Sequence, residues 1–337
     1  MTIEPRVVIA HDFLEAYGGA ERIAATIASA FPEASVFAIL GRRSVAERMG
    51  VEDRVRFLID APERVLRHYR ALAPLYPALV AARRLPEADV LVTSSYAFAH
   101  GLRTRNDAPQ LCYCYSPLRF AWTMTEEYGR EIGRGSAGTR ALAALAAPMR
   151  WADRRAARRV DRYVAESAYV AGQLERFYGV TAEVLHPPVD TDTFRPAERP
   201  GDHDGYFLLC GRLVEPYKRP GLAVEAFRGT GLRLLVAGDG PALGALRATA
   251  DKNVEFLGAL EDRELVRLMQ RCAAAIFPSR DDFGLIPIEV AACGRPTLAF
   301  RAGGALETLV PGVTGEFFDR QDTSSLRAAL RAFDPDA

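Results

Sequence analysis

The chain has 337 residues with 43 basic and 43 acidic side chains, so its formal net charge is zero. This balance argues against general nucleic-acid binding, and the length predicts two domains rather than one core. No apolar stretch of about eighteen residues is present, so we expect no membrane span. An N-terminus that leads directly into a strand, and five cysteines without a framework pattern, favour a cytoplasmic protein.

Short apolar runs alternate with helical segments along the first half of the chain. His11 and Asp12 are expected to end the first strand, and Gly18-Gly19-Ala20-Glu21 then opens a helix. The predicted strands of this half are Val7–Ala10, Val36–Leu40, Val90–Thr93, Leu111–Tyr115 and Tyr163–Ala165. Continuous apolar runs separated by helices indicate a parallel sheet that helices cover on both faces.

A stretch rich in Pro, Asp and Thr, from Leu185 to Gly205, is interpreted as a connector to a second half of the same kind. The predicted strands of this half are Tyr206–Cys210, Leu234–Ala237, Val254–Leu257, Ala274–Phe277 and Thr297–Phe300. Two doubly wound domains are therefore predicted, residues 1–185 and residues 186–337. Such sheets bind ligands at the carboxyl ends of their strands, so we expect the domains to face each other across a cleft.

Candidate residues of the first domain stand where its strands are expected to end. Glycines after the first strand allow close approach to the first amides of a helix, which favour a phosphate or a polar acceptor. The candidates are Gly18, Gly19, His11, Asp12, His100 and Tyr115, whose hydroxyl can donate a hydrogen bond. An ordinary strand–helix turn and structural histidines are the alternatives.

The first strand of the second domain is followed by Gly211, Arg212 and Lys218, and Pro216 prevents a helix between the two cations. A fork-shaped guanidinium and a compact ammonium at the carboxyl end of a strand suit a diphosphate. A solvated basic turn is the alternative interpretation of the pair.

Two carboxylates, Asp281 and Glu289, stand eight positions apart after a short buried strand. Pro287 suits the first turn of a helix, so we expect Asp281 on the loop and Glu289 in the first helical turn. The amides of Phe283-Gly284-Leu285 are expected to be exposed between them. Carboxylates accept hydrogen bonds from hydroxyls and amides can face an anion, so this stretch suits a sugar joined to a nucleotide.

Glycine pairs mark further strand–helix turns of the second domain. Gly303 and Gly304 precede a short helix whose first amides favour an anion, with a plain helix cap as the alternative. Gly240 is expected in a tight turn that supports the fold or contacts the nucleotide. Asp190-Thr191-Asp192 has the spacing of a metal-binding pair, but it follows a connector rather than an apolar strand, so we expect no metal.

In chain order these motifs resemble those of retaining glycosyltransferases of family 4, which have the GT-B fold. The Asp281–Glu289 pair is similar to the family's two acidic residues eight positions apart, with aspartate where glutamate is usual. The other matching pieces are Gly18-Gly19-Ala20-Glu21, the stretch from Val184 to Phe194, Gly211-Arg212-Leu213 with Lys218-Arg219, Gly238-Asp239-Gly240-Pro241, and Gly303-Gly304-Ala305-Leu306-Glu307. The most similar branch is that of bacterial mannosyltransferases that build surface polysaccharides.

The resemblance implies an α/β GT-B fold and transfer of a sugar, mannose from GDP-mannose, to a glycan or lipid-linked acceptor with retention. It implies that Arg212 and Lys218 bind the donor diphosphate, that Asp281 orients the sugar and that Glu289 orients the ribose. It implies no metal and no other cofactor, and the zero net charge argues against a nucleic-acid partner. Tyr115 stands where relatives often carry histidine, which separates this chain from the family pattern.

Two alternatives to a transferase stay open. One is a non-catalytic subunit that binds a nucleotide or a glycan, and the other is a nucleotide-sugar epimerase or hydrolase of the same fold. The carboxylate pair argues against the epimerase, which usually uses other carboxylates. Members of the family usually continue into a final helix that crosses back to the first domain, and we expect that helix to be short or missing here.

The neutral total hides an asymmetry. Residues 1–185 carry 25 basic and 21 acidic side chains, a net +4, and the remainder carries 18 and 22, a net −4. The basic excess is concentrated in Arg150, Arg154, Arg155, Arg158, Arg159 and Arg162. A basic amphipathic helix binds an anionic membrane or a lipid-diphosphate acceptor, so peripheral contact with the inner face of the cell membrane is one hypothesis and a solvated face is the other.

Overall fold

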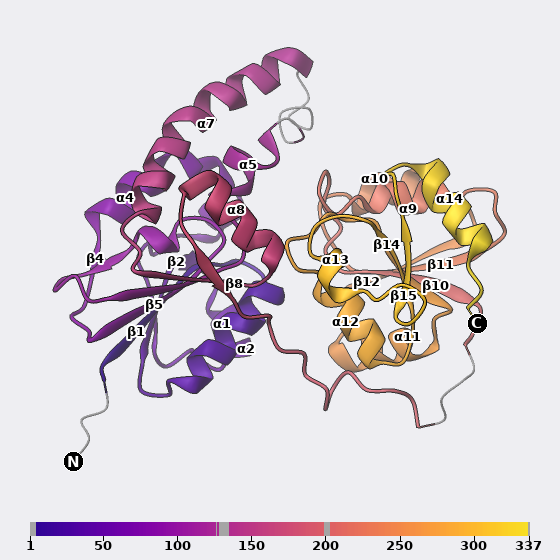
Figure 1. Cartoon of the computed structure of the whole chain (residues 1–337), viewed down its shortest axis with the longest axis horizontal. Helices are drawn as coiled ribbons and strands as arrows, with labels where there is room; N and C mark the ends of the chain where they lie inside the picture. The colour runs from indigo at the N-terminus through magenta and orange to yellow at the C-terminus, as the bar shows by residue number, and fades with distance from the viewer. Residues whose placement is uncertain (1–4, 126, 128–134, 199–202, 336–337) are drawn as a thin grey trace. The chain divides into compact units, whose positions relative to one another are not determined.

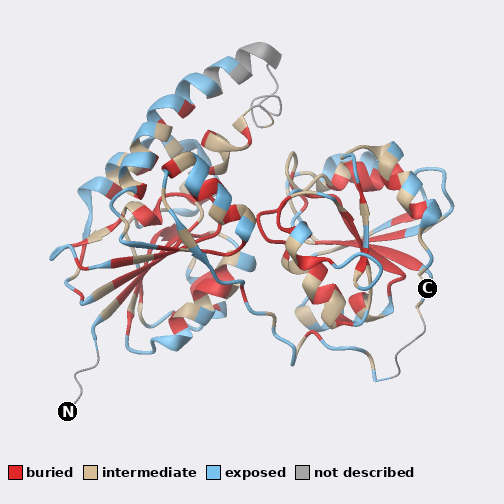
Figure 2. Ribbon diagram, viewed as in Figure 1, coloured by how far each residue is buried: buried red, intermediate tan, exposed pale blue. Residues whose placement is uncertain are grey.

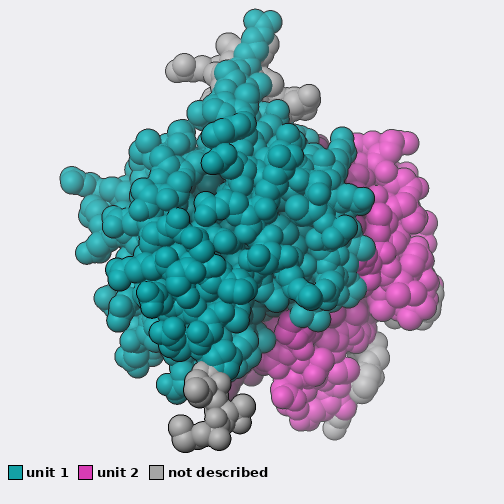
Figure 3. Space-filling view, turned by 60° about the vertical axis from the view of Figure 1, so that its left-hand side comes forward, with its two compact units in different colours: residues 1–187 teal, residues 188–337 magenta. Residues whose placement is uncertain are grey.

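The computed structural model describes residues 5–125, 127, 135–198 and 203–335. The chain forms two compact units, residues 1–187 and residues 188–337, which Figure 3 distinguishes by colour. The boundary lies two residues after the predicted position. In the part of the chain that the structure describes, no helix has the length and apolar character that crossing a membrane requires.

Unit 1 contains a seven-stranded parallel sheet in the order β3-β2-β1-β5-β7-β8-β9 (Figure 1). Its strands are β1 (Val7–Leu14), β2 (Ser35–Gly41), β3 (Val55–Phe57), β5 (Val90–Ser95), β7 (Gln110–Cys114), β8 (Arg162–Ala165) and β9 (Ala182–Val184). A separate pair is formed by β4 (Arg84–Leu85) and β6 (Arg103–Thr104). The sequence does not predict β3 and β9, because these edge strands are three residues long and carry exposed Arg56 and Glu183.

Strand β1 continues beyond its predicted end. Its pairing with β2 extends to Leu14 and Gly41, and His11 and Asp12 are fully buried. The prediction that these two residues end the strand is therefore wrong. Polar residues usually mark the end of a buried strand, but these two find hydrogen-bond partners inside the unit.

Helices cover both faces of this sheet. They are α1 (Gly19–Ala30), α2 (Arg43–Arg48), α3 (Glu63–Leu66), α4 (Tyr76–Ala82), α5 (Arg119–Trp122), α7 (Gly135–Ala157) and α8 (Ala168–Tyr178), with 3-10 turns η1 (Tyr69–Leu75) and η2 (Ala99–Gly101). Val8 packs in a cluster with Met149 of α7, whereas its neighbour Ile9 packs with Ala24 of α1. Because successive strand residues point to opposite faces, α1 and α7 lie on opposite sides of the sheet.

Unit 2 repeats the architecture with a six-stranded parallel sheet in the order β12-β11-β10-β13-β14-β15. Its strands are β10 (Tyr206–Cys210), β11 (Arg233–Ala237), β12 (Val254–Gly258), β13 (Ala274–Phe277), β14 (Thr297–Phe300) and β15 (Gly315–Phe318). Its helices are α9 (Pro220–Phe227), α10 (Leu243–Thr249), α11 (Asp262–Arg271), α12 (Leu285–Ala292), α13 (Ala305–Thr308) and α14 (Thr323–Ala332). The buried strands and half-exposed helices are visible in Figure 2.

Each sheet has one point where the strand order reverses. In unit 1 the chain moves outward from β1 through β2 to β3 and then returns to place β5 on the other side of β1. In unit 2 it moves from β10 through β11 to β12 and returns to place β13 beside β10. The loops after β1 and β5, and those after β10 and β13, therefore diverge and leave room for a ligand.

Candidate active site

The loops that leave β10 and β13 bring together three of the predicted site residues. Arg212 and Lys218 follow β10 and Asp281 follows β13. The Lys218 ammonium donates to Asp281 Oδ2, so the predicted phosphate-binding cation and the predicted sugar-binding carboxylate are in direct contact. The topology explains this contact, because both loops leave neighbouring parallel strands at the same edge.

A small pocket of about 20 Å³ lies at this edge, with room for about one water molecule. Its lining includes Arg212 and Lys218 from the first loop, Ser279 from the second, and Cys210 and Ile286 between them. The structure thus places both predicted cations on one concave surface of unit 2.

The second acidic residue, Glu289, is buried on α12, the helix whose Ile286 lines the pocket. Burial raises the pKa of the Cys210 thiol, the Glu289 charge raises it further and the Lys218 charge opposes this rise. Cys210 lines the pocket, so the charges of Glu289 and Lys218 both reach it. The helix begins at Leu285, which puts Glu289 in its second turn and not in the first turn as predicted.

One oxygen of the Asp281 carboxylate is buried without a hydrogen bond from the described residues. The residue is 8% exposed, and the oxygen concerned is Oδ1. A buried carboxylate oxygen in this state is costly, and a hydroxyl or amide donor from a ligand would satisfy it.

The predicted glycine loops support the site by allowing backbone segments to touch. A Cβ on Gly303 would overlap the Asp281 carbonyl oxygen, and one on Gly304 would overlap the Phe283 backbone. The Gly304 amide also donates to the Asp281 carbonyl at 2.9 Å. The role that the structure shows for these two glycines is therefore close packing beneath the Asp281 loop, since α13, which follows them, has only four residues.

Three other glycines have the same kind of role. Gly240 has a φ of 157°, and a Cβ there would overlap the carbonyl of Leu213 on the loop after β10. Gly211 has a φ of 112°, and a Cβ there would lie 3.0 Å from Ile286. Gly284, with a φ of 89°, caps α12. Phe283 and Gly284 are buried, so the expected exposure of this amide run holds only in part, at half-exposed Leu285.

We expect Gly303→Ala to destabilise the protein more than a matched glycine variant. Gly303 and Gly229 have similar φ values, 65° and 69°, but only Gly303 has backbone atoms where the new methyl group would lie. The overlap should cost about 1–3 kcal/mol beyond the strain that both variants share. Urea unfolding of the two variants measures this difference. Equal losses of stability would show that the Asp281 loop yields freely and that its position does not depend on Gly303.

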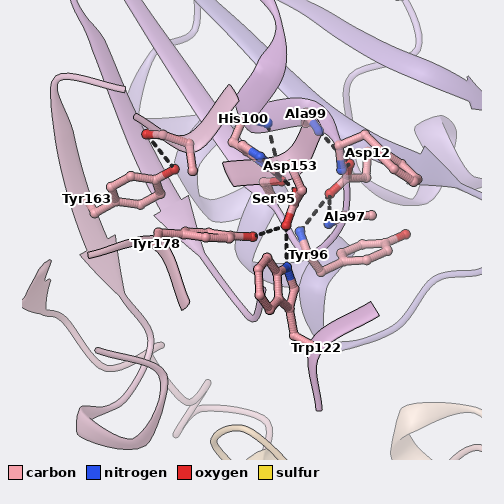
Figure 4. Close-up of polar contacts among 12 residues, drawn as sticks. Asp12, Ser95, Tyr96, Ala97, Ala99, His100, Trp122, Asp153, Tyr163 and Tyr178 are labelled. Atoms are coloured by element: carbon pink, nitrogen blue, oxygen red, sulfur yellow. Dashed lines mark hydrogen bonds and ion pairs between the residues drawn. The ribbon is translucent and has the colours of Figure 1, made fainter. Parts of the chain in front are cut away.

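The corresponding edge of unit 1 is arranged around Asp12. Its Oδ2 accepts from the amides of Tyr96 at 2.6 Å and Ala97 at 2.9 Å, and its Oδ1 accepts from those of Phe98 at 2.6 Å and Ala99 at 2.7 Å (Figure 4). All four amides belong to the turn that follows β5. The carboxylate is therefore occupied in fixing this turn, which is a structural role that the sequence does not predict.

A second set of contacts joins His11 to Tyr115. His11 Nδ1 lies 2.9 Å from Ser94 Oγ, which lies 2.8 Å from the Tyr115 hydroxyl. That hydroxyl donates to the Ala20 carbonyl at 2.9 Å, so the hydrogen bond expected of Tyr115 stays within the protein. Burial raises the pKa of Tyr115 well above its ordinary value, which keeps the hydroxyl protonated.

The predicted phosphate loop begins α1. The Gly18 amide donates to Glu21 Oε2 at 2.9 Å, and Glu21 Oε1 lies 3.7 Å from His11 Nε2. Glu21 thus caps its own helix and provides a negative charge beside His11. Gly19 is the first residue of the helix. A side chain of the same helix therefore already uses one of the amides that were expected to face an anion.

His100 lies inside unit 1, 5% exposed, and not at its surface. Its Nε2 atom is 3.2 Å from Asp153 Oδ1, and its Nδ1 atom is 3.3 Å from Ser95 Oγ (Figure 4). Asp153 Oδ2 accepts from Trp122 Nε1 and from the Tyr178 hydroxyl, both at 2.6 Å. Burial opposes the charged imidazole, but the hydrogen bond and charge of Asp153 outweigh it and raise the pKa of His100 to about 9.

Asp153, which fixes His100 in this buried network, is the residue that sequence reasoning missed. A signal for it exists, because it is the one acidic residue of α7 and it follows Ala146 and Met149 at helical spacing on the buried face. A lone carboxylate on an apolar face requires buried partners. Here they are a histidine, a tryptophan and a tyrosine from three other elements.

Asp190 forms a local turn. Its Oδ1 accepts from the amides of Asp192 at 3.1 Å and Thr193 at 3.2 Å, and its Oδ2 accepts from the Thr193 hydroxyl at 2.6 Å. Over the described ranges, no group of three or more His, Cys, Asp or Glu side chains is placed to hold a metal ion.

Two family models match the chain. Residues 17–193 match "Glycosyltransferase Family 4" and residues 204–333 match "Glycosyl transferases group 1". The first match covers more than half of the chain.

Sequence relatives agree with these matches. D-inositol 3-phosphate glycosyltransferase 1 of Catenulispora acidiphila is 30% identical over 202 residues, which are 51% of this chain and 48% of the relative. D-rhamnosyltransferase WbpZ of Pseudomonas aeruginosa is 29% identical over 189 residues, 51% of this chain and 49% of the relative. The chain thus spans about half the length of the curated relatives it matches.

The fold comparison covers both units. A crystal structure of Anabaena HepE in complex with UDP aligns with a TM-score of 0.65 at 17% identity, over 96% of this chain and 89% of that one. This similarity supports the expected GT-B fold, with two Rossmann-like domains. Together with the family matches and the motifs at the edges of both sheets, it shows that the chain belongs to glycosyltransferase family 4.

Proposed function

We propose that this protein transfers a sugar from a nucleotide sugar to a glycan or lipid-linked acceptor, with retention at the anomeric carbon. The observation that carries the proposal is the contact between Lys218 and Asp281 beside Arg212, at the point where the strand order of unit 2 reverses. The two cations that line the pocket match the diphosphate of the donor, and the Asp281 carboxylate that contacts Lys218 matches its polyhydroxy sugar.

In the proposed mechanism, breaking the bond between sugar and diphosphate places negative charge on the leaving oxygen. Lys218 and Arg212 stabilise that charge, which lowers the barrier because they are already positioned before the reaction. Asp281 Oδ1 accepts a hydrogen bond from a sugar hydroxyl, and Glu289 accepts one from the ribose. The leaving diphosphate takes the acceptor proton on the same face of the sugar, so no separate general base is needed.

A thermal-shift screen against GDP-, UDP-, ADP- and dTDP-sugars tests the donor. We propose GDP-mannose, from the resemblance to mannosyltransferases. A second HepE structure, in complex with UDP-glucose, makes that nucleotide sugar the natural comparison. A donor at a hundred times its Kd stabilises the folded state by about 2.7 kcal/mol, which should raise Tm by roughly 5–10 °C for a domain of this size. A shift without donor turnover would favour the non-catalytic subunit, and the absence of any shift would contradict a nucleotide-sugar site.

We expect activity to survive an excess of EDTA. In the proposed site the charge of the diphosphate is met by Lys218 and Arg212, and the Asp190 carboxylate is engaged by the turn that it forms. Donor turnover measured with and without EDTA checks this. Complete loss, restored by Mg²⁺ or Mn²⁺, would make Asp190 and Asp192 ligands after all.

The proposed acceptor is lipid-linked, which requires contact with a membrane surface. The structure changes which arginines are available for that contact. Arg150 donates to the Ala121 carbonyl, and Arg154 donates to the Phe177 carbonyl at 2.8 Å and lies over the Trp122 ring. These two arginines therefore stabilise the fold, and Arg159 lies 3.8 Å from the Asp107 carboxylate. The charges proposed to meet a membrane are therefore those of Arg155 and Arg158.

A further inference from the structure

The outer face of α7 combines small apolar residues, an exposed tryptophan and arginines in one stripe. Trp151 is 68% exposed, whereas Phe31, the other exposed large aromatic side chain among the described residues, is 38% exposed. Helical spacing places Ala144, Ala147 and Pro148 on the N-terminal side of Trp151 and Arg155 and Arg158 on its C-terminal side, all of them exposed. Figure 2 shows that much of this long helix is exposed.

The opposite face of the same helix is fully used. Ala146, Met149, Asp153 and Ala157 recur at helical spacing and are buried in unit 1. Packing of the unit therefore explains the inner face and leaves the outer face unexplained. A solvated helix face usually carries charged residues of both signs. This face combines a largely exposed indole with charges of one sign.

The charge of this face has one sign. Between residues 143 and 159 the single acidic residue is Asp153, which is buried and paired with His100. The Arg155 guanidinium lies 5.9 Å from the centre of the Trp151 ring, so a cation stands directly beside the indole. A partner for this face must therefore be anionic and must accept an amphipathic ring at its surface.

We propose that the outer face of α7 docks on an anionic lipid bilayer, with the Trp151 indole inserted at the level of the headgroups. Tryptophan prefers the interface between membrane and water, because its ring is apolar and its N–H is polar. Arg155 and Arg158, one and two turns further along the helix, reach the lipid phosphates. The small residues before Trp151 let the helix approach the bilayer closely. The inference rests on the proposed lipid-linked acceptor, for which it names the surface that meets the membrane.

Fluorescence of the full-length protein with brominated lipids tests this insertion directly. The chain has two tryptophans, and Trp122 is packed against Phe177 inside unit 1. Vesicles of phosphatidylglycerol and phosphatidylcholine with bromine near the headgroup should quench wild-type emission, whereas Trp151→Phe, which keeps only Trp122, should show no quenching. Quenching that persists in this variant, or wild type that binds without quenching, would overturn the insertion.

Sedimentation with unbrominated vesicles supplies matched controls. Trp151→Ser should weaken binding about tenfold, and Leu75→Ser, at an exposed residue elsewhere in unit 1, should leave it unchanged. Arg155→Gln with Arg158→Gln should weaken binding strongly, and Arg56→Gln with Arg83→Gln, the same change of charge elsewhere, should not. Binding should require phosphatidylglycerol and fade at high salt.

Three outcomes would overturn the proposal: equal binding by each variant and its control, equal binding to neutral vesicles, or no binding at low salt. If no binding occurs at low salt, the partner of the outer face of α7 would instead be an acidic protein. None of these measurements uses donor or acceptor, so their failure leaves the transferase proposal intact. Conversely, Trp151→Ser should keep wild-type binding of nucleotide sugar, since α7 lies in the other unit.

Discussion

Replacing Lys218 with alanine should weaken binding of the nucleotide-sugar donor by roughly fifty-fold or more, because a charge-assisted hydrogen bond typically contributes about 2–3 kcal/mol. The substitution removes a cation from the pocket and also deprives Asp281 of its partner. Isothermal titration with the donor found by the thermal-shift screen measures the loss.

The chain supplies a close control for this variant. It contains only one other lysine, Lys252, which is exposed in a turn. Lys252→Ala makes the same change of net charge and should bind donor like wild type. If the two lysine variants bind equally well, the site lies elsewhere.

Glu289→Ala extends the same test to the second predicted carboxylate, whose charge reaches Cys210 in the pocket lining. The Glu289 carboxylate is proposed to bind the ribose, so its loss should weaken the binding of free nucleoside diphosphate as well as the binding of the complete donor. Far-UV circular dichroism and Tm separate this effect from unfolding, since Glu289 is buried. A fully folded variant that turns over donor at the wild-type rate would remove Glu289 from the site.

The sequence predicts the strands whose interiors are continuous apolar runs, because burial on both faces leaves few other options. Each of the ten predicted strands is present, while short edge strands such as β3 and β15 are not foreseen. An edge strand is partly exposed to solvent, so its sequence of polar and apolar residues resembles that of a loop. The end of β1 is misplaced for the opposite reason, since Asp12 looks like a terminator until its four amide partners are known.

Part of the candidate site is predictable in the same way. The predicted topology places the loops that carry Lys218 and Asp281 at the same edge of the sheet. It does not predict that the two side chains are in contact. The position of Gly303 under the Asp281 carbonyl is beyond prediction from a single sequence, because it joins two loops that local patterns do not relate. Glu289 is misplaced by one turn because the helix start depends on the left-handed backbone of Gly284, and glycine allows but does not require that conformation.

Removing the carboxylate of Asp153 should destabilise the protein by about 3–5 kcal/mol, the usual cost of leaving one partner of a buried ion pair alone. Asp153 joins four elements, since its partners lie on η2, α5 and α8 while it lies on α7. Urea unfolding of Asp153→Ala at pH 7 measures the loss. Glu183→Ala, which breaks an exposed pair with Arg162 at 3.5 Å, should cost less than about 1 kcal/mol.

The same pair should make stability depend on pH. The pKa of His100 is about 9 in the folded protein and 6.5 for the ordinary side chain, so the folded state binds this proton more tightly. The stabilisation is fully present below about pH 6.5, decreases as pH rises and is lost once pH exceeds about 9. Its size is on the order of 3 kcal/mol.

Unfolding of wild type and His100→Gln between pH 6 and pH 9.5 isolates this contribution, since every other group titrates in both proteins. Wild type should lose stability across this range relative to the variant, and the difference between them should shrink towards pH 9.5. Tyr178 does not interfere, because burial raises its pKa well above its ordinary value and it stays protonated throughout. Parallel pH profiles for the two proteins would mean that His100 is neutral in the folded state and that Asp153 is held by Trp122 and Tyr178 alone.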